Sequence, residues 1–263
     1  MNAAPNNVTA LPTGTARHHY DQIGSTNTQA FALQQTGITL PAWVSATHQT
    51  DGRGRGANAW QSLPGNLQAS YVFSTACDMQ HISQLAFVAG LAVRDTVRNL
   101  LPDTIESRDL VSLKWPNDIL CAGQKLAGIL VQTMRNDPGS ESTAVIGVGL
   151  NIATTPHGLE QPVTSLRRLL GPAAELPSAT QTISELDQNL SGWLLRWRDG
   201  QGWRDVRTNW IAQNGLFGHR VSVRNGDTAY SGIMKGLDET GALLIVTDEN
   251  KQQRVTFGDI ALV

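Results

Sequence analysis

The segment best equipped for chemistry is a glycine-rich stretch that carries two arginines, Gly52-Arg53-Gly54-Arg55-Gly56. Glycines let the backbone approach a ligand closely and expose its N–H groups. Arginine adds a permanent positive charge and forked donors that suit phosphate or carboxylate. The stretch lacks the Gly-Lys-Ser/Thr ending of the NTPase phosphate loops. It therefore predicts a loop that wraps an anion, and a plain surface loop or a short nucleic-acid contact is the competing interpretation.

Two lysines stand in contexts that suit a charged site. The chain has only four lysines beside sixteen arginines, and Lys114 and Lys125 lie in one apolar stretch. Lys114 begins Lys-Trp-Pro-Asn-Asp, which brings a lysine, an aromatic plane, an amide and a carboxylate to the turn after a strand. Lys125 leads into an apolar strand in which Gly128 removes a side chain, a feature that often marks close approach by a ligand. An enclosed lysine there could stabilise negative charge; a solvated turn and an ordinary strand-start lysine are the alternatives.

A later strand carries two glycines on one face and ends at an asparagine. Gly147 and Gly149 alternate with branched apolar residues, and Asn151 follows. Because side chains alternate between the faces of a strand, one face is left bare. That face fits a flat ligand lying against the backbone, and a close strand-on-helix contact would give the same pattern.

Hydrophobic periodicity predicts the elements that must position these segments. Alternation and apolar runs predict strands, and apolar positions three or four apart predict helices. The strands are expected at 42–47, 67–73, 111–114, 119–121, 126–133 and 144–152, and the longer helices at 83–100 and 183–197. This order predicts an α+β fold with a largely antiparallel or mixed β-sheet, rather than an alternating parallel array. Three parts are expected: a flexible N-terminal tail (1–19), a main domain (20–215) and a small domain of short strands (216–263).

Composition narrows the classes of function. The formal net charge is −2 and the sequence pI is about 6.3, which gives no general electrostatic footprint for nucleic acid. No apolar run approaches the roughly 18 residues of a membrane span, and no export signal is visible. Cys77 and Cys121 form no C-x-x-C pair, which fits two buried thiols in a reducing cytosol. We therefore expect a cytoplasmic protein that binds neither DNA nor a membrane.

Taken in order along the chain, these motifs resemble those of the biotin protein ligases, the biotin–[acetyl-CoA-carboxylase] ligases. The resemblance runs from about residue 20 to the C-terminus. The segments that carry it are Gly24-Ser-Thr-Asn27, Gln49 with Gly52-Arg-Gly-Arg55 and Trp60, Lys114-Trp-Pro-Asn-Asp118, Lys125-Leu-Ala-Gly-Ile-Leu130 and Gly147-Val-Gly-Leu-Asn-Ile152. It implies a class II aminoacyl-tRNA synthetase-like catalytic domain, with a mixed β-sheet flanked by helices, and a small C-terminal Src-homology-3-like β-barrel.

The resemblance also implies an activity and its residues. Such an enzyme uses ATP and Mg²⁺ to convert biotin to biotinyl-5'-AMP, then passes the biotinyl group to a lysine of a biotin carboxyl carrier protein, an acetyl-CoA carboxylase subunit. The implied catalytic residues are Arg53, Arg55, Asp118 and Lys125. The implied biotin-binding residues are Ser25, Thr26, Asn27, Gln49, Gly52, Arg53, Lys125, Gly128 and Ile129. The implied ATP or adenylate contacts are Arg55, Trp60, Lys114, Asn117 and Asn151, and no metal ligand is assigned.

The chemistry of that reaction suits these residue types. Attack of a carboxylate on the α-phosphate brings two anions together, so it requires neutralisation and alignment rather than a strong base. A carboxylate such as Asp118 could then orient the incoming amine or relay its proton. A loop that closes over the adenylate would protect it from water.

The sequence departs from the family pattern in two places. The segment Gly56-Ala57-Asn58-Ala59 before Trp60 is less basic than usual, which places more weight on Arg53 and Arg55. Only about twenty residues precede the first motif, where some members carry a DNA-binding domain, and this disfavours a biotin-responsive repressor.

Two other interpretations stay open. The nearest is a lipoate or octanoate protein ligase or transferase of the same fold. The other is a non-catalytic nucleic-acid-binding module, which is disfavoured because residues 215–263 carry five basic and six acidic side chains. The expected assembly is a monomer or a homodimer.

Overall fold

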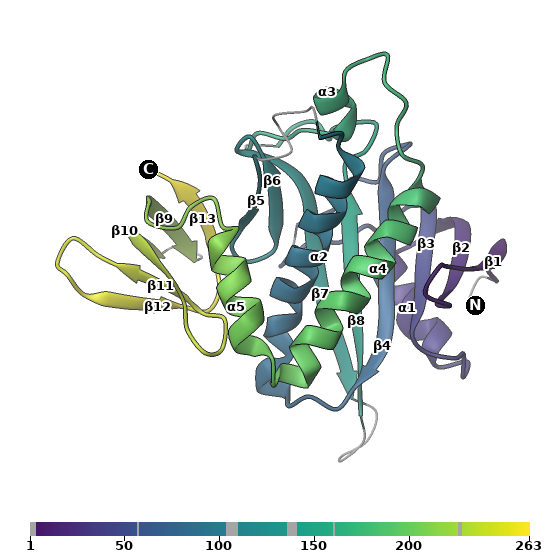
Figure 1. The fold of residues 1–263 in the computed structure, drawn as a ribbon, viewed down its shortest axis with the longest axis horizontal. Coiled ribbons are helices and arrows are strands. Elements are labelled where there is room, and N and C mark those ends of the chain that lie inside the picture. The colour runs from purple at the N-terminus through teal and green to yellow at the C-terminus, as the bar shows by residue number, and fades with distance from the viewer. Residues whose placement is uncertain (1–3, 57, 104–109, 136–140, 160, 226–227) are drawn as a thin grey trace.

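An eight-stranded sheet forms the centre of the fold (Figure 1). The computed structural model describes residues 4–56, 58–103, 110–135, 141–159, 161–225 and 228–263. The strands are β1 (Asn7–Ala10), β2 (Ala16–Ile23), β3 (Ala42–Gln49), β4 (Leu67–Thr75), β5 (Val111–Lys114), β6 (Asp118–Cys121), β7 (Gln124–Arg135) and β8 (Ser142–Leu150). Their order across the sheet is β1-β2-β3-β4-β8-β7-β6-β5. Strands β2 and β3 run parallel and the other neighbouring pairs run antiparallel, which confirms the predicted mixed sheet.

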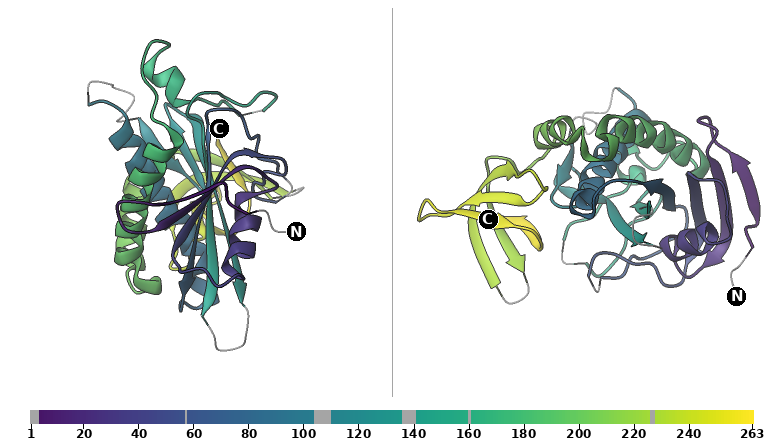
Figure 2. Two further views of the ribbon diagram at one scale, coloured as in Figure 1. Left: turned by 90° about the vertical axis from the view of Figure 1, so that its right-hand side faces the viewer. Right: turned by 90° about the horizontal axis from the view of Figure 1, so that it is seen from below.

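Helices cover both faces of this sheet. Figure 2 shows α1 (Thr26–Gln34) on one face and the longer α2 (Leu85–Leu100) and α4 (Ala179–Trp197) together on the other. The shorter elements are η1 (Met79–Gln84), α3 (Leu166–Leu170), η3 (Arg198–Gly200) and α5 (Trp203–Ala212). The predicted α+β class is confirmed. No helix in the described parts of the chain is long and apolar enough to cross a membrane.

The pairing of α2 with α4 rests on apolar packing and on tryptophan hydrogen bonds. In α4, predicted as a helix at 183–197, the apolar residues three or four positions apart are all buried: Ile183, Leu186, Leu190, Trp193 and Trp197. Trp193 Nε1 donates to Asp95 Oδ2 at 2.8 Å, and Trp197 Nε1 donates to Gln84 Oε1 at 2.8 Å. These bonds satisfy buried indole N–H groups that would otherwise lose their hydrogen bonds to water. They fix one helix against the other.

A buried carboxylate joins α4 to the sheet. Asp187 is fully buried and accepts hydrogen bonds from Trp43 Nε1 of β3, at 2.9 Å, and from Thr13 Oγ1. Buried charges are retained where they are hydrogen-bonded, as this one is. The Trp43 side chain of β3 therefore lies on the face of the sheet that α4 covers.

The expectation of a flexible tail is wrong for much of residues 7–19. Residues 7–10 form β1, and β2 begins at Ala16 and pairs in parallel with β3. Apolar alternation is weak in this segment because β2 carries Arg17, His18 and His19, and Arg17 is buried through hydrogen bonds. The hydrophobic pattern used to predict strands is therefore missing where polar contacts hold a strand in place.

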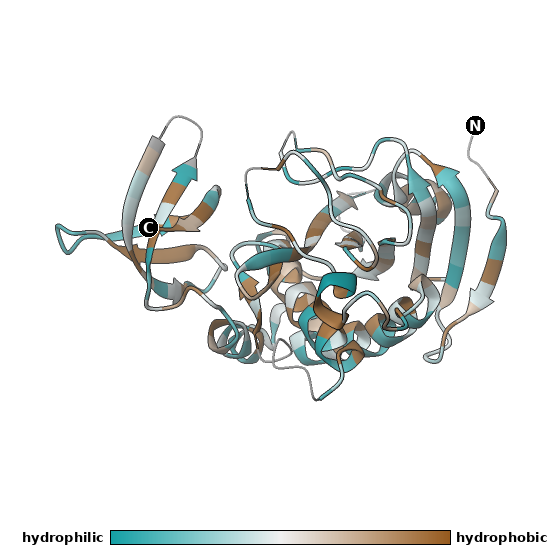
Figure 3. Cartoon of the chain, turned by 90° about the horizontal axis from the view of Figure 1, so that it is seen from above, coloured by the Kyte–Doolittle hydropathy of each residue, from teal (hydrophilic) through white to brown (hydrophobic). Residues whose placement is uncertain are grey.

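A second sheet of five strands forms the C-terminal part. Its strands are β9 (Arg220–Asn225), β10 (Thr228–Leu237), β11 (Leu243–Val246), β12 (Gln252–Val255) and β13 (Asp259–Leu262), in the order β12-β11-β10-β9-β13. All neighbouring pairs are antiparallel, and Figure 3 shows apolar and polar segments alternating along them. The predicted boundary at residue 216 lies between α5 and β9. Trp115 Nε1 donates to the carbonyl oxygen of Gly241 at 3.2 Å, so the first sheet's turn is tied to the second sheet.

Candidate active site

The floor of the candidate site is bare backbone on the α1 side of strands β7 and β8. Gly128 pairs directly with Gly149 across these strands, and Gly147 lies two residues further along the same face. Side chains on the opposite face, such as Ile146 and Val148, belong to the core that α2 and α4 cover. The alternation of the sequence therefore produces a flat area without side chains, as predicted.

Trp60 lies flat on this floor. A Cβ at Gly149 would lie 2.2 Å from Trp60 Cε2, and one at Gly128 would lie 3.2 Å from Trp60 Cζ3. Only glycine admits the ring at position 149, because real Cβ atoms do not approach other atoms so closely. Trp60 Nε1 is buried and has no hydrogen-bond partner among the described residues. The indole thus covers the floor and retains an unused donor.

The N-terminus of α1 brings together most of the predicted biotin-binding side chains. Gln49 Oε1 accepts from the backbone N–H of Thr26 at 2.7 Å and from Thr26 Oγ1 at 3.0 Å. Asn27 Nδ2 donates to Gln132 Oε1 at 2.8 Å, and Asn27 Oδ1 lies where a Gly147 side chain would begin, 2.3 Å from its Cβ position. Ser25 is buried at the N-cap, yet its side chain makes no capping bond. Its hydroxyl is therefore available to a ligand.

The glycine-rich segment folds back on itself. The backbone N–H of Trp60 donates to the Gly52 carbonyl at 2.9 Å, and that of Gly54 donates to the Asn58 carbonyl at 2.7 Å. A Cβ at Gly52 would lie 2.4 Å from the Trp60 carbonyl oxygen, so the close approach requires glycine. In the less basic segment at 56–59, Ala57 lies outside the described residues, and the other three positions are described.

The two arginines of this loop have different surroundings. Arg53 forms an ion pair with Asp51 at 2.6 Å, and both side chains are more than half exposed. Arg55 is mostly enclosed, and its Nη1 lies 3.4 Å from Asn117 Oδ1. Burial lowers the pKa of Arg55, and the carboxylates of Asp259 and Asp118 oppose that shift. The structure therefore brings Arg55 into the site and leaves Arg53 directed towards solvent.

Arg55 also joins the loop to the C-terminal sheet. Its guanidinium lies over the Phe257 ring, 5.1 Å from the centroid, and both Nη atoms approach the Gly258 carbonyl at 3.4 Å. Asp259 Oδ1 lies 3.6 Å from Nη1. Sequence reasoning missed these contacts, because nothing in the pattern links residue 55 to a segment about two hundred positions away.

Lys125 and Asp118 form an ion pair beside the glycine floor. The distance from Lys125 Nζ to Asp118 Oδ1 is 2.7 Å, and the two side chains are 19 % and 12 % exposed. The pair arises because β6 and β7 are antiparallel neighbours, and Asp118 lies opposite Gly128 in the register. Lys125 Nζ is 3.6 Å from the position that a Gly128 side chain would occupy. A positive and a negative group thus stand together where the sequence predicted catalysis.

Three other predicted residues serve the framework. Ile129 is 3 % exposed and packs in the core on the helix side, away from the glycine floor. Asn117 Nδ2 donates to the Ile129 carbonyl at 2.7 Å, which fixes the turn after β5. Asn151 Nδ2 donates to the Thr164 carbonyl at 3.1 Å. The amide groups of both asparagines are thus engaged in holding neighbouring segments.

The remaining predicted residue, Lys114, lies opposite Asp118 in the register of the β5–β6 hairpin and is partly exposed.

Sequence reasoning also missed Ser70. Its hydroxyl lies 2.7 Å from Thr26 Oγ1 and 2.6 Å from Asn27 Oδ1. A signal was present, because Ser70 is a polar residue inside a strand predicted from its apolar neighbours.

Comparison with known proteins places this site in a family. Residues 20–151 match the model of the Biotin/lipoate A/B protein ligase family, and residues 216–263 match the Biotin protein ligase C terminal domain. The chain belongs to the biotin/lipoate A/B protein ligase family. The family match spans α1, the glycine-rich loop, the Lys125–Asp118 pair and both strands of the glycine floor.

Individual relatives of this chain also come from the biotin/lipoate ligase family. A biotin–[acetyl-CoA-carboxylase] ligase of Mycobacterium tuberculosis is 32 % identical over 85 % of this chain and 80 % of its own length. A protein of the same name from Paracoccus denitrificans is 30 % identical over 84 % of this chain and 90 % of its own length. The biotin protein ligase from Aquifex aeolicus, solved in complex with biotin and ATP, has the same fold, with a TM-score of 0.75, 22 % identity and coverage of 94 % of this chain and 98 % of that one.

Proposed function

We propose that this protein is an ATP-dependent biotin–[acetyl-CoA-carboxylase] ligase that forms biotinyl-5'-AMP and transfers biotin to a lysine of a biotin carboxyl carrier protein. The observation that carries the proposal is the Lys125–Asp118 ion pair beside a floor of glycine backbone, with Arg55 enclosed nearby. The names of the relatives from two bacteria support biotin over lipoate as the acid. The same fold in a protein solved with biotin and ATP supports the pair of substrates.

The polar cluster at the N-terminus of α1 suits the ureido head of biotin. The hydroxyl of Ser25, which makes no capping bond, is a donor for a carbonyl oxygen, as are the first-turn backbone N–H groups of α1 beyond Thr26, whose own N–H donates to Gln49. The rest of biotin is largely apolar and fits a pocket with few polar groups. The glycine floor gives that part of the molecule a surface of backbone to lie against.

In the first step, a carboxylate oxygen of biotin bonds to the α-phosphorus of ATP and pyrophosphate leaves with the bonding electrons. Both reactants are anions, so positive charge at the point of contact lowers the barrier. Lys125 and Arg55 supply that charge from mostly enclosed positions. The ammonium group of Lys125 can exchange Asp118 for the substrate anions without a change in its own protonation.

In the second step, the amine nitrogen of the carrier lysine bonds to the acyl carbon and AMP leaves. The attacking amine must be neutral and must lose a proton as the amide forms. Once Lys125 contacts the adenylate, Asp118 is free to hold that amine and to accept its proton. The ion pair thereby prepares both groups for different steps.

Mg²⁺ fits this site as a companion of ATP. No group of three or more His, Cys, Asp or Glu side chains that could hold a metal occurs within the ranges that the structure describes. Mg²⁺ commonly binds through substrate phosphates with one or two carboxylates and water. The ion would neutralise phosphate charge, and the protein groups described above would position the reactants.

A comparison of two acids tests the proposed substrate. AMP formation is measured with ATP and either biotin or lipoate, using the same enzyme preparation. We expect AMP with biotin and at most a trace with lipoate. AMP formation with lipoate alone would refute this proposal and would identify the protein as a lipoate ligase.

The partner and the compartment are part of the proposal. The carrier would be a folded biotin carboxyl carrier domain whose target lysine reaches Asp118. Cys77 and Cys121 are both buried thiols, which fits a reducing compartment such as the cytoplasm. The site described above is built from one copy of the chain, so either a monomer or a homodimer would present it.

A further inference from the structure

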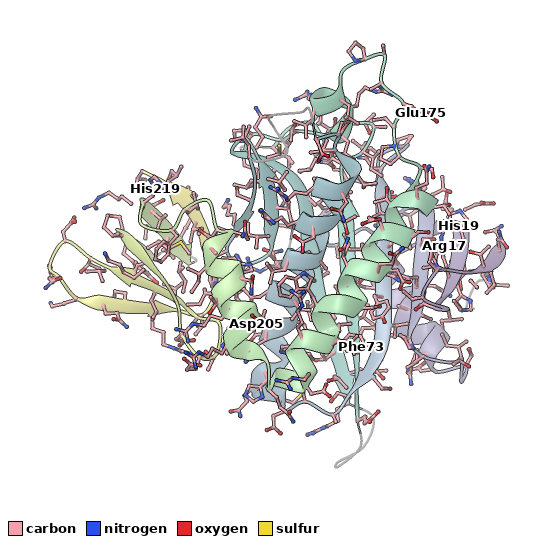
Figure 4. All side chains as sticks on the ribbon, in the orientation of Figure 1. Arg17, His19, Phe73, Glu175, Asp205 and His219 are labelled. Atoms are coloured by element: carbon pink, nitrogen blue, oxygen red, sulfur yellow. The ribbon has the colours of Figure 1, made fainter. Side chains whose placement is uncertain are left out.

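A second pocket lies on the α4 side of the main sheet. Its volume is about 340 Å³, and its lining includes Arg17, His19, Ser45, Asn66 and Ala179. Arg17 lies opposite Trp43 in the register, and the Trp43 indole contacts α4, so the Arg17 side chain lies on the face opposite the glycine floor. Figure 4 shows Arg17 and His19 next to each other on this side of the molecule.

Arg17 brings an unneutralised charge into this pocket. The residue is 7 % exposed, and its hydrogen-bond partners are neutral side chains. Its Nε donates to Ser45 Oγ at 2.9 Å, its Nη1 donates to Thr180 Oγ1 at 2.7 Å, and its Nη2 lies 3.2 Å from His19 Nδ1. No carboxylate of the described residues forms an ion pair with it. A guanidinium has five N–H donors, so two are left for a ligand.

A buried arginine without a counter-charge is costly. Burial lowers the pKa of Arg17, and no neighbouring acid offsets that shift. Buried charges are normally paired, because an isolated ion loses its hydration without compensation. A bound anion would supply the missing charge and accept the two remaining N–H groups.

The start of α4 adds to the same electrostatic field. This helix has nineteen residues and begins at the pocket, where Ser178 and Ala179 are part of the lining. A helix N-terminus carries partial positive charge, which favours anions. The N–H groups of Ser178 and Gln181 are already taken by the capping box of α4, so the helix contributes here through its dipole. The hydroxyls of Ser45 and Thr47 give the pocket further polar groups. Fixed charge, helix dipole and hydroxyls therefore converge on one space.

We propose that this pocket is a binding site for a small phosphoryl anion, with Arg17 as its principal ligand. Phosphate or pyrophosphate fits easily within 340 Å³ and matches the forked donors of a guanidinium. Its principal ligand, Arg17, lies on the face of the sheet opposite the glycine floor, where the adenylation chemistry is proposed.

Isothermal titration of the full-length protein with inorganic phosphate, in a chloride buffer, tests this proposal. We expect saturable binding at one equivalent, and at least about tenfold weaker binding in Arg17→Gln, since a charged hydrogen-bonding fork is worth about 1.4 kcal/mol or more. Arg135→Gln is the matched control. Arg135 is an exposed residue at the C-terminal end of β7, opposite Ser142 of β8 in the register. This variant should bind phosphate as the unchanged protein does.

A second variant keeps the test decisive if Arg17→Gln unfolds. Thr180→Asp places a carboxylate where Arg17 Nη1 now donates, in the first turn of α4, where acidic residues are favourable. We expect a higher melting temperature and at least a tenfold loss of phosphate binding. No saturable phosphate binding by the unchanged protein would overturn the proposal. Binding that survives in Thr180→Asp but disappears in Arg55→Gly would overturn it too, because the anion would then lie in the nucleotide site.

Discussion

Replacing Lys125 by methionine separates the chemical role of this lysine from its structural role. Its Nζ lies 2.7 Å from Asp118 Oδ1 and beside the floor where the substrates are proposed to meet. Removing one preorganised charge-stabilising donor costs about 2.7–4 kcal/mol in the transition state, a factor of about 10² to 10³ in rate. The Lys125 side chain is 19 % exposed, so water screens part of its field. We therefore expect the lower end, about a hundredfold slower adenylate formation.

The same substitution leaves Asp118 almost buried and without its partner. An unsatisfied buried group costs about 1–3 kcal/mol of unfolding free energy, and more when it is charged. The double variant Lys125→Met with Asp118→Asn removes both charges. It should recover part of that stability, because the two positions interact directly. It should not recover the rate of the first step.

The assay is pyrophosphate release in a single turnover with biotin and ATP, read beside urea unfolding of each variant. Lys251→Met is the matched control, since Lys251 also forms an ion pair, with Glu249, yet is 72 % exposed. It should be neutral in both measurements. A normal first-step rate in Lys125→Met would refute the charge role. If the double variant recovered the first-step rate as well as the free energy of unfolding, the role of Lys125 would be structural only.

Three further predictions follow from the geometry. Arg55→Gly removes the contact between the glycine-rich loop and the C-terminal sheet, so we expect the adenylate to escape and to label lysines of a bystander protein; labelling confined to the carrier, measured by mass spectrometry, would contradict this. Gly149→Ala places a methyl group 2.2 Å from Trp60, so calorimetry should show biotin binding weakened by about tenfold or more. Gly192→Ala, whose Cβ meets open space in α4, is its control and should raise unfolding free energy by up to about 1 kcal/mol. Burial raises the pKa of Cys121 to about 11, which keeps its thiolate scarce at pH 8, so alkylation should be slow in the folded protein and fast in urea; equal rates would show that the thiol is accessible.

The sequence was most informative where residue type and local geometry suffice. The bare floor follows from the alternate glycines of β8 and the single Gly128 of β7, and the buried stripe of α4 follows from apolar residues at helical spacing. In both cases the pattern repeats along one element. It therefore needs no knowledge of distant partners.

The features that the sequence pattern did not predict depend on contacts between distant segments. Arg53 and Arg55 are the same residue type two positions apart, yet one pairs with Asp51 in solvent and the other contacts the C-terminal sheet. The polar strand β2 was missed because its Arg17 is buried by hydrogen bonds to Ser45 and to α4. The contact of Asn151 with the adenylate stays a prediction, and the hydrogen bond from its side-chain amide N–H group to the Thr164 carbonyl was not predicted. Local pattern does not encode these partners.

Carrier biotinylation by this protein is tested by the intact mass of a biotin carboxyl carrier domain after incubation with the protein, biotin, ATP and Mg²⁺. We expect the carrier to gain one biotinyl group on a single lysine. Omission of ATP should abolish the gain, and a carrier with arginine at that lysine should gain nothing. An unchanged carrier mass under complete conditions would contradict this expectation.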